Sequence, residues 1–490
     1  ICHIWAEVLG LALDKVGIRD DFFRLGGDSI ISIQLVSRLR QKLGLIVSVK
    51  DIFSYKNIER LYDNIISQAS NDNTKLNIVT EQGMLSGELS LLPIQEWFFE
   101  NSLTVPNHWN QSFIVQTPKL DIDKLKVSVA KLINHHDSFR LRYKKNKDST
   151  QNSTIRVIDT SYIQYYDSNI KAEELKTLDI RSLKDKEGSK EFEAELQDIL
   201  TKWQSQFNIE SGPTYSIGYI YGYEDGSSRV YFALHHLIVD SVSWRILTED
   251  LRDIYNQKDL RPKGSSYRQW VNTVSEYANT HKAETDYWVK VLSSYDNSNN
   301  NQLTILAHGI NTQSYADLQL NQEQTKQLLR ESNRAYHTQV NDILLTALGY
   351  TLSEITGNKT NHIVLEGHGR EGIDATIDIT RTLGWFTTMY PVVLEVSEDL
   401  GNSLKNIKED LRQIPNKGIG YGALIGYRSG VESRLQLQQH TLPRISFNYL
   451  GQFGKEDKLQ SSQVQTSFWN IVSEGSGISM HSDNQDYNII

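Results

Sequence analysis

Cysteine is nearly absent from this chain of 490 residues, whose single example is Cys2. An internal disulfide is therefore excluded, and this usage is typical of proteins from a reducing compartment. The sequence also contains no uninterrupted apolar run of about 18 residues and no amino-terminal signal pattern. We therefore expect a cytoplasmic protein that has no membrane partner.

Positive charge is not concentrated anywhere, because the net charge is −9 and the chain has no basic block. Nucleic acid is therefore not an expected partner. Neither an HExxH sequence nor a set of cysteines occurs, so we expect no metal. The length suggests about three domain-sized units. The chain opens without Met inside an amphipathic pattern, and we expect it to be part of a longer protein.

What the sequence does contain, near its start, is a glycine-rich turn that leads into an apolar helical pattern. Two glycines release the backbone into the turn, Asp28 and Ser29 are residue types that cap helices, and apolar residues then recur near a 3.6 period. A helix should begin at Ser29, and its amino-terminal N–H groups would favour a phosphate ester on that hydroxyl. From these residues alone, an ordinary capped helix is the commoner explanation.

The chain divides into a small helical part and a larger part of mixed structure. Residues 1–67 indicate a small all-α bundle, and residues 68–84 are polar enough for a flexible linker. Beyond them strand-like runs alternate with helical patterns, which predicts an α/β architecture of two lobes, 85–290 and 291–490. The expected helices span 1–11, 29–43, 58–66, 120–134, 191–206, 243–255, 325–330 and 339–352, and the expected strands span 111–116, 229–234, 313–320 and 363–365.

One predicted strand ends in two histidines, His235 and His236, with Asp240 four residues beyond the second. Successive side chains on a strand point to opposite faces, so only one of these histidines can serve a given site. Three interpretations stay open from the residues alone: a metal ligand, a structural pair at a strand end, and a catalytic base. A similar pair, His135 and His136, ends a helical pattern, and we interpret it as structural.

Both parts of the chain resemble domains of nonribosomal peptide synthetases. The segment DFFRLGGDSI at 21–30 resembles the attachment site of peptidyl carrier domains, and the Asp before the Ser resembles the subset of carriers that feed an epimerization domain. The segment HHLIVDSVSW at 235–244 is similar to the signature shared by condensation and epimerization domains, with Ser241 where glycine is common. Six further segments resemble the epimerization version: LPIQEWFF at 92–99, NDILLTA at 341–347, EGHGRE at 366–371, RTLGWFTTMYP at 381–391, GIGYG at 418–422 and FNYLGQ at 447–452.

This resemblance implies a carrier bundle followed by the two-lobed chloramphenicol acetyltransferase-like fold of the condensation and epimerization superfamily. Ser29 would carry covalent 4'-phosphopantetheine, with Asp28 beside it. His236 would face a central channel, and Asp240 would hold the active-site loop through an ion pair, for which Arg381 is the expected partner. The implied partners are an upstream adenylation domain, a downstream condensation or thioesterase domain and a phosphopantetheinyl transferase, and the chain itself would be monomeric.

The chemistry of inversion at Cα supports the same assignment. A proton must leave one face of the carbon and return to the other, which calls for two acid or base groups on opposite sides. His236 and Glu366 are such a pair if the fold brings them face to face. Asn448, Tyr449 and backbone N–H groups are candidates for stabilising the enolate oxygen. We expect His368, Arg370 and Glu371 to shape the loop that presents Glu366.

Two other functions stay open from the sequence. A condensation domain would form a peptide bond with the same histidine and would not require Glu366, and a silent carrier-binding module would use neither residue. Which of His236 and Glu366 takes the proton from the L face is also open, as is the side chain of the substrate. Family members continue for several strands past the FNYLGQ segment, so we expect the second lobe to be shortened at its end.

Overall fold

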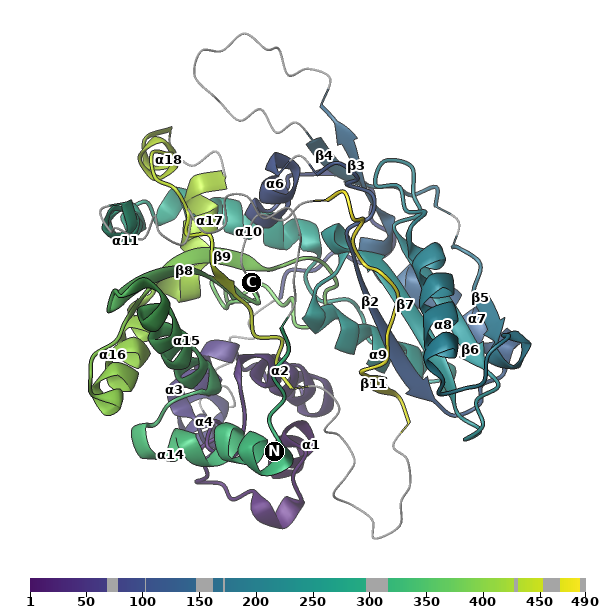
Figure 1. Ribbon diagram of the computed structural model, residues 1–490, viewed down its shortest axis with the longest axis horizontal. Helices are drawn as coiled ribbons and strands as arrows, with labels where there is room; N and C mark the ends of the chain where they lie inside the picture. Colours follow the sequence, from purple (N-terminus) through teal and green to yellow (C-terminus); the bar gives the residue numbers. More distant parts are fainter. Residues whose placement is uncertain are drawn as a thin grey trace.

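A computed structural model describes residues 1–67, 78–101, 103–146, 162–170, 172–296, 316–426, 431–452 and 468–484. Most of the expected linker, residues 68–77, lies outside the described residues. The rest forms a helical bundle that sits at the base of two lobes, each built around a β-sheet (Figure 1). The described chain contains no helix that is both long enough and apolar enough to cross a membrane.

The carrier bundle packs its helices around Trp5, Phe22 and Leu35, which are fully buried. The predicted helix start at Ser29 is confirmed, because Asp28 Oδ1 accepts a hydrogen bond from Ile31 N at 2.7 Å. This helix ends where Gly44 takes a left-handed conformation, which glycine adopts without steric strain. The helices are α1 (Cys2–Leu9), η1 (Leu13–Lys15), α2 (Ser29–Leu43), α3 (Val49–Tyr55), α4 (Ile58–Leu61) and η2 (Tyr62–Ile66).

The first lobe contains a five-stranded sheet in the order β11-β2-β7-β6-β5. Its central strand, β7, is buried at every position and pairs antiparallel with β2, with His235 opposite Asn110. Side chains alternate between the two faces, so Phe113 and Phe232 pack on one side while Ile114 and Tyr231 pack on the other. The strands are β2 (Asn110–Thr117), β5 (Lys176–Asp179), β6 (Tyr215–Tyr221), β7 (Ser228–His235) and β11 (Asn470–Val472).

Helices cover both faces of this sheet, as apolar residues on both faces require. α8 lies on one face, and α7 and α9 lie on the other (Figure 1). The remaining helices are α6 (Pro93–Glu100), α7 (Ile122–His135), η3 (Asp137–Arg140), η4 (Ile180–Ser182), α8 (Lys190–Gln204), η5 (His236–Ile238), α9 (Ser241–Tyr255) and α10 (Tyr267–Thr280). A small antiparallel sheet in the order β1-β4-β3 completes the lobe, with β1 (Gly87–Leu89), β3 (Leu141–Lys145) and β4 (Tyr162–Tyr166).

The second lobe contains a three-stranded sheet in the order β10-β8-β9, packed on its own apolar core. Its strands are β8 (Thr360–Gly367), β9 (Thr388–Glu395) and β10 (Ser446–Phe447). Its helices are α11 (Glu284–Asp296), α13 (Gln322–Lys326), η6 (Gln327–Glu331), α14 (Ser332–Tyr336), α15 (Val340–Thr356), α16 (Leu400–Gln413), η7 (Pro415–Gly418), α17 (Ile419–Gly426) and α18 (Val431–Gln438).

One expectation about this lobe is wrong. Residues 316–320 of the strand expected at 313–320 are exposed and form no strand, because no neighbouring strand pairs with them, and the first three residues lie outside the description. The boundary predicted between residues 290 and 291 lies within α11. Trp288 belongs to the core of the second lobe, and β11 returns to the first lobe to pair with β2. Strand pairing over such a distance leaves no local pattern in a sequence.

Candidate active site

A cavity of about 530 Å³ lies where the carrier bundle meets both lobes. Ser29 from the start of α2, His236 from the end of β7 and Glu366 from β8 all line it. Asn448 and Tyr449, which follow β10, line it as well. The structure therefore brings together residues that are separated by more than 400 positions along the chain.

Two hydrogen bonds define the state of the His236 ring. Its Nδ1 lies 3.0 Å from the carbonyl oxygen of Val239. Because a carbonyl only accepts, Nδ1 carries the proton and Nε2 has the lone pair. The side-chain amide of Gln111 donates to this Nε2 at 2.9 Å, and its oxygen in turn accepts from Trp244 Nε1 at 2.9 Å. Since an indole nitrogen can only donate, Trp244 sets which end of the Gln111 amide faces the histidine.

The surroundings of His236 favour the neutral imidazole. Its ring centroid is 4.3 Å from that of Trp385 and 5.1 Å from that of Trp109. Burial lowers the pKa of His236 to about 4, although the Val239 carbonyl and Asp240 act in the opposite direction. At neutral pH the ring is therefore able to accept a proton at Nε2.

His235 is turned away from the cavity, as strand alternation predicts. Its Nε2 lies 2.7 Å from the carbonyl oxygen of Pro106, and its Nδ1 accepts from Leu237 N at 3.2 Å. The side chain is fully buried, and burial lowers the pKa of His235 to about 3. His136 also lies elsewhere, where its Nε2 is 3.0 Å from Asp250 Oδ2. Neither histidine lines the cavity that contains His236.

Glu366 reaches the cavity from the carboxyl end of β8, opposite Met389 of β9. Asn448 Nδ2 donates to Glu366 Oε2 at 2.8 Å, which orients the carboxylate. The loop that follows is held by His368, whose Nδ1 accepts from Arg370 N at 3.0 Å and whose Nε2 is 3.4 Å from Glu371 Oε1. Gly369 is required in this loop, because a Cβ there would lie 1.6 Å from the backbone oxygen of Phe386.

Asp240 both caps a helix and forms an ion pair, at the end of the loop that begins with His236 (the histidine loop). Its Oδ1 caps α9 by accepting from Ser243 N at 2.8 Å. Arg370 Nη2 also lies 3.1 Å from each of its carboxylate oxygens, in a pair that is almost completely buried. Arg370 comes four residues after Glu366, so this ion pair connects the histidine loop to the glutamate loop.

Arg381, the expected partner of Asp240, is therefore the wrong arginine. Its Nη1 donates to Glu249 Oε2 at 2.7 Å, and its Nη2 contacts Asp250 Oδ1. Both carboxylates lie near the carboxyl end of α9, whereas Asp240 caps the amino end of the same helix. The sequence offers two arginines within the resembling segments, and only the packing of α9 distinguishes them.

The carrier reaches the catalytic domain through the residues that precede Ser29. Tyr449 Oη is 3.4 Å from Asp28 Oδ2, a long hydrogen bond. Gln452 Nε2 donates to the backbone oxygen of Gly26 at 3.2 Å, and Arg245 Nη2 donates to the backbone oxygen of Gln452 at 2.7 Å. Burial raises the pKa of Asp28, which the Ile31 N–H and Arg245 partly oppose. Burial also raises the pKa of Tyr449, and Asp28 adds to the effect.

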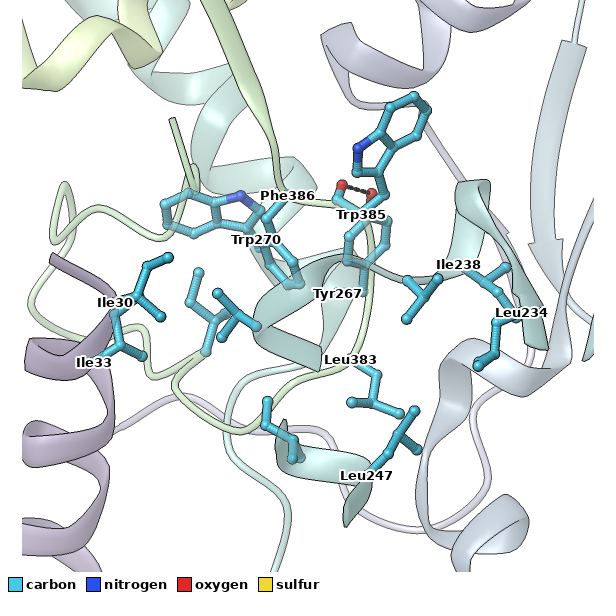
Figure 2. Close-up of a cluster of buried hydrophobic side chains, with 14 of the residues drawn as sticks. Ile30, Ile33, Leu234, Ile238, Leu247, Tyr267, Trp270, Leu383, Trp385 and Phe386 are labelled. Atoms are coloured by element: carbon cyan, nitrogen blue, oxygen red, sulfur yellow. Dashed lines mark hydrogen bonds between the residues drawn. The ribbon is translucent and has the colours of Figure 1, made fainter. Parts of the chain in front are cut away.

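Charged and apolar contacts complete this docking. Arg38 Nη2 is 3.3 Å from Glu249 Oε1, and Arg40 contacts Asp378. Ile30 and Ile33 point from the same helix, α2, toward an apolar cluster of the catalytic domain (Figure 2). Both isoleucines are at most 5% exposed. The helix of the carrier is therefore packed against the catalytic domain with Ser29 at the cavity.

The residues around Ser29 fit a phosphopantetheine group. Ser29 lies at the amino end of α2, where unpaired N–H groups favour a phosphate. Lys56 lines the same cavity, and Arg245 is close enough to Asp28 to lower its pKa. These residues would hold the phosphate while the arm extends toward His236. No cluster of metal-ligating side chains occurs in the described ranges.

Sequence reasoning did not find Gln111 or Trp244 as parts of the site. Gln111 lies in a strand that was predicted for its apolar character, and its position beside His236 follows from the pairing of β2 with β7. Trp244 closes the 235–244 segment, and its indole N–H orients Gln111. No signal in the sequence indicates either role. Asn448, which was expected to donate to the enolate oxygen, donates one N–H to Glu366 Oε2.

Known proteins share both parts of this chain. Residues 85–480 match the condensation domain family, and residues 1–65 match the phosphopantetheine attachment site family. N-(5-amino-5-carboxypentanoyl)-L-cysteinyl-D-valine synthase of Amycolatopsis lactamdurans is 39% identical over 93% of this chain and 11% of that protein. Gramicidin S synthase 1 of Brevibacillus brevis is 36% identical over 93% of this chain and 40% of that protein. The chain thus spans well under two thirds of these relatives.

Solved structures agree with the expected fold class. The epimerization domain from the third module of tyrocidine synthetase B has a TM-score of 0.65 and 32% identity, covering 83% of this chain and 87% of that chain. The first condensation domain of the calcium-dependent antibiotic (CDA) synthetase shares the fold at a TM-score of 0.53 and 15% identity, over 75% and 84%. The predicted carrier bundle and chloramphenicol acetyltransferase-like domain are therefore confirmed. The chain belongs to the condensation-domain family of nonribosomal peptide synthetases and has a phosphopantetheine-bearing carrier domain at its amino end.

Proposed function

We propose that this chain epimerizes the Cα of an aminoacyl or peptidyl thioester carried by phosphopantetheine on Ser29, and is therefore an isomerase. The observation that carries this proposal is that Ser29, His236 and Glu366 line one cavity. A condensation reaction needs the histidine but gives no role to a carboxylate that Asn448 orients. The likeness to an epimerization domain at 32% identity supports the same conclusion.

His236 is the acid or base on one face of Cα. The bound group supplies a thioester, whose carbonyl makes the neighbouring C–H more acidic. With Nδ1–H donated to Val239, only Nε2 is able to take or return the proton. Gln111 must release Nε2 for this to happen, and the cost is that of one hydrogen bond, about 0.5–1.5 kcal/mol. General acid or base catalysis by such a group is worth roughly 10²–10⁴ in rate.

Glu366 is the second acid or base. Asn448 donates to its Oε2 and so orients the carboxylate through which Glu366 would exchange a proton with Cα. An amide nitrogen carries two hydrogens, so Asn448 can also donate to the enolate oxygen of the acyl group. Asp240 and Arg370 position both groups, since their ion pair connects the two loops. Tyr449 holds the carrier through Asp28.

Exchange of the Cα proton in deuterium oxide tests this proposal. A phosphopantetheinyl transferase would load Ser29 with an L-aminoacyl phosphopantetheine, and exchange and D product would be followed by mass spectrometry and chiral chromatography. We expect both to fall at least about 100-fold in Glu366→Gln and in His236→Ala, since each removes one acid or base group. Glu191→Gln and His3→Ala are matched controls, because both residues are exposed.

The alternatives predict different results. A condensation domain would form peptide bonds with an acceptor amine in Glu366→Gln and would show no Cα exchange, and the family match and His236 are the observations in its favour. A silent carrier-binding module would show neither reaction. Exchange that persists at the parent rate in both variants would contradict the two-base proposal. The adenylation domain upstream and the condensation or thioesterase domain downstream remain proposed partners of the whole synthetase.

A further inference from the structure

A second cavity, of about 310 Å³, lies outside the site described above. It is enclosed by α6, α10, α17 and residues 386–389. These elements lie on the side of the lobes away from the carrier bundle (Figure 1). Its walls are mostly apolar, and the large apolar residues that line it are Trp97, Trp270, Phe386, Met389, Ile419 and Leu442.

One of the polar residues in the lining is Glu96, a carboxylate that the proposed reaction does not use. Its side chain lines the cavity from α6, and the residue is only 8% exposed. Its Oε2 lies against Gly426, and within the described part of the chain no donor forms a hydrogen bond with it. Burial raises the pKa of Glu96 to about 8, Glu100 adds to this by repulsion, and Arg434 partly opposes it without forming an ion pair. Such a group is costly unless a ligand compensates it.

A short wall segment connects this cavity to the reaction centre. The Trp385 ring contacts His236, Phe386 lines the second cavity, and Thr387 lines both cavities. Tyr267 Oη donates to the backbone oxygen of Trp385 at 2.8 Å and holds the segment in place (Figure 2). Ser29 lines the first cavity only, so the arm enters from that side of the shared wall.

We propose that the second cavity binds the part of the acyl chain distal to Cα, and that Glu96 selects chains with a primary ammonium there. This inference rests on the proposed function and names its substrate class. Among the described residues, Oε2 of Glu96 has no hydrogen-bond donor and no counter-charge beside it. An ammonium supplies both, through its three N–H groups and its positive charge. The apolar walls accommodate the carbon chain that carries it. Without a cation, burial and Glu100 favour the protonated form of Glu96, which attracts no ammonium.

Matched substrates test the selection. Ser29 would be loaded with dipeptidyl and tripeptidyl thioesters that differ only in a free or an acetylated terminal amine, and Cα exchange would be measured for each pair. We expect the free amine to react at least about 10-fold faster, as a charge-assisted hydrogen bond implies. This ratio should fall to about 1 in Glu96→Gln and persist in Glu191→Gln, whose site is exposed.

The pH dependence of the ratio separates an ammonium from a neutral ligand. Glu96 must lose its proton to pair with a cation, so the ratio should rise between about pH 6 and pH 7, below the pH of about 8 at which the terminal amine itself loses its proton. The other charged or titratable groups that face Glu96 are Glu100 from its own helix, Arg434 from α18 and His440, which lines the cavity. A ratio that falls over this range would mean that protonated Glu96 donates to a neutral group, and would overturn the proposal.

A binding measurement keeps the test independent of turnover. Non-reactive dipeptidyl pantetheine thioethers, with the amine free or acetylated, would be titrated while the fluorescence of Trp97 and Trp270 is followed. The free amine should bind about 10-fold more tightly in the parent and not in Glu96→Gln. Equal affinity in the parent overturns the subsite whatever the exchange assay shows. Absent exchange with selective binding would contradict the proposed function alone.

A structural role for Glu96 predicts something else. If Glu96 serves only as the counter-charge of Arg434, then Arg434→Met and Glu96→Gln should lower Tm alike and change exchange of free and acetylated substrates by the same factor. That result would overturn the proposal. The selective subsite instead predicts that Glu96→Gln alone removes the ratio.

Discussion

Replacement of Gln111 by Met or Glu perturbs His236 without touching the histidine itself. Gln111 donates to Nε2, and this hydrogen bond favours the neutral ring with its proton on Nδ1. Met fills a similar volume and removes the donor. Glu keeps the acceptor for Trp244 Nε1 and places a carboxylate oxygen where the amide donor was. The two variants therefore separate loss of the bond from reversal of its polarity.

The size of each effect follows from the geometry. Removing one neutral hydrogen bond of about 0.5–1.5 kcal/mol corresponds to a rise of roughly 0.4–1 pKa unit, since one unit is about 1.36 kcal/mol. The pKa of His236, which burial holds at about 4, should therefore stay below about 5 in Gln111→Met. An opposite charge within hydrogen-bond distance raises a histidine pKa by about 1–3 units. In Gln111→Glu the pKa should therefore lie between about 5 and 7.

Histidine labelled with ¹⁵N gives a direct readout of both tautomer and pKa by NMR, and His236→Ala identifies its signals. In the proposed reaction the neutral ring takes up the proton, so exchange should be lost as pH falls through the pKa of His236. This acid limb of the pH profile should move upward in the order parent, Met, Glu. At pH 7 the Glu variant should also lose at least about 10-fold in exchange rate, because it favours a proton on Nε2. Gln322→Glu, at an exposed position, is the control. If the parent, both Gln111 variants and the control have the same His236 tautomer and the same acid limb in their pH profiles, the reasoning is refuted.

Three further perturbations have defined outcomes. Ser29→Ala should abolish the mass gain on phosphopantetheinyl transfer. Tm should change little, because Asp28 and not Ser29 provides the side-chain cap of α2. A mass gain that persists in this variant would contradict the assignment of Ser29. Asp240→Asn leaves Arg370 buried without its counter-charge and should cost about 3–5 kcal/mol of stability, read as a lower Tm; parent-like stability would contradict the structural role. Glu96→Gln should raise Tm relative to the parent at pH 8 and not near pH 4. The folded pKa of the carboxyl is raised from 4.5 to about 8, so the folded parent loses stability as pH rises between these values. A difference in Tm that does not change with pH would argue against the burial of the charge.

Sequence reasoning was most successful where the signal is local. The cap at Asp28 and the start of α2 at Ser29 follow from a few neighbouring residues, and the structure has both. The alternation of His235 and His236 also follows from strand geometry alone. The prediction that Arg381 pairs with Asp240 was wrong, because Arg370 and Arg381 both lie in segments that resemble the family. Their carboxylate partners, Asp240 and Glu249, lie toward opposite ends of α9, and only the packing of that helix shows which arginine meets which. The strand expected at 313–320 failed because a strand needs a partner as well as a pattern.

The sequence by itself determined the two-part organisation, the helix that presents Ser29 and the residue types available for proton transfer. Each depends on contacts within a few residues or on a resemblance spread over ordered segments. The tertiary structure decided the rest: that Ser29, His236 and Glu366 share one cavity, that Gln111 sets the tautomer of His236, and that Glu96 lies unpaired in a second cavity. These relations depend on the pairing of β2 with β7, on the packing of α2 against both lobes and on the contact of α6 with α17. The physical reason is that pairing and burial over hundreds of residues are properties of the packed chain, which no local pattern encodes.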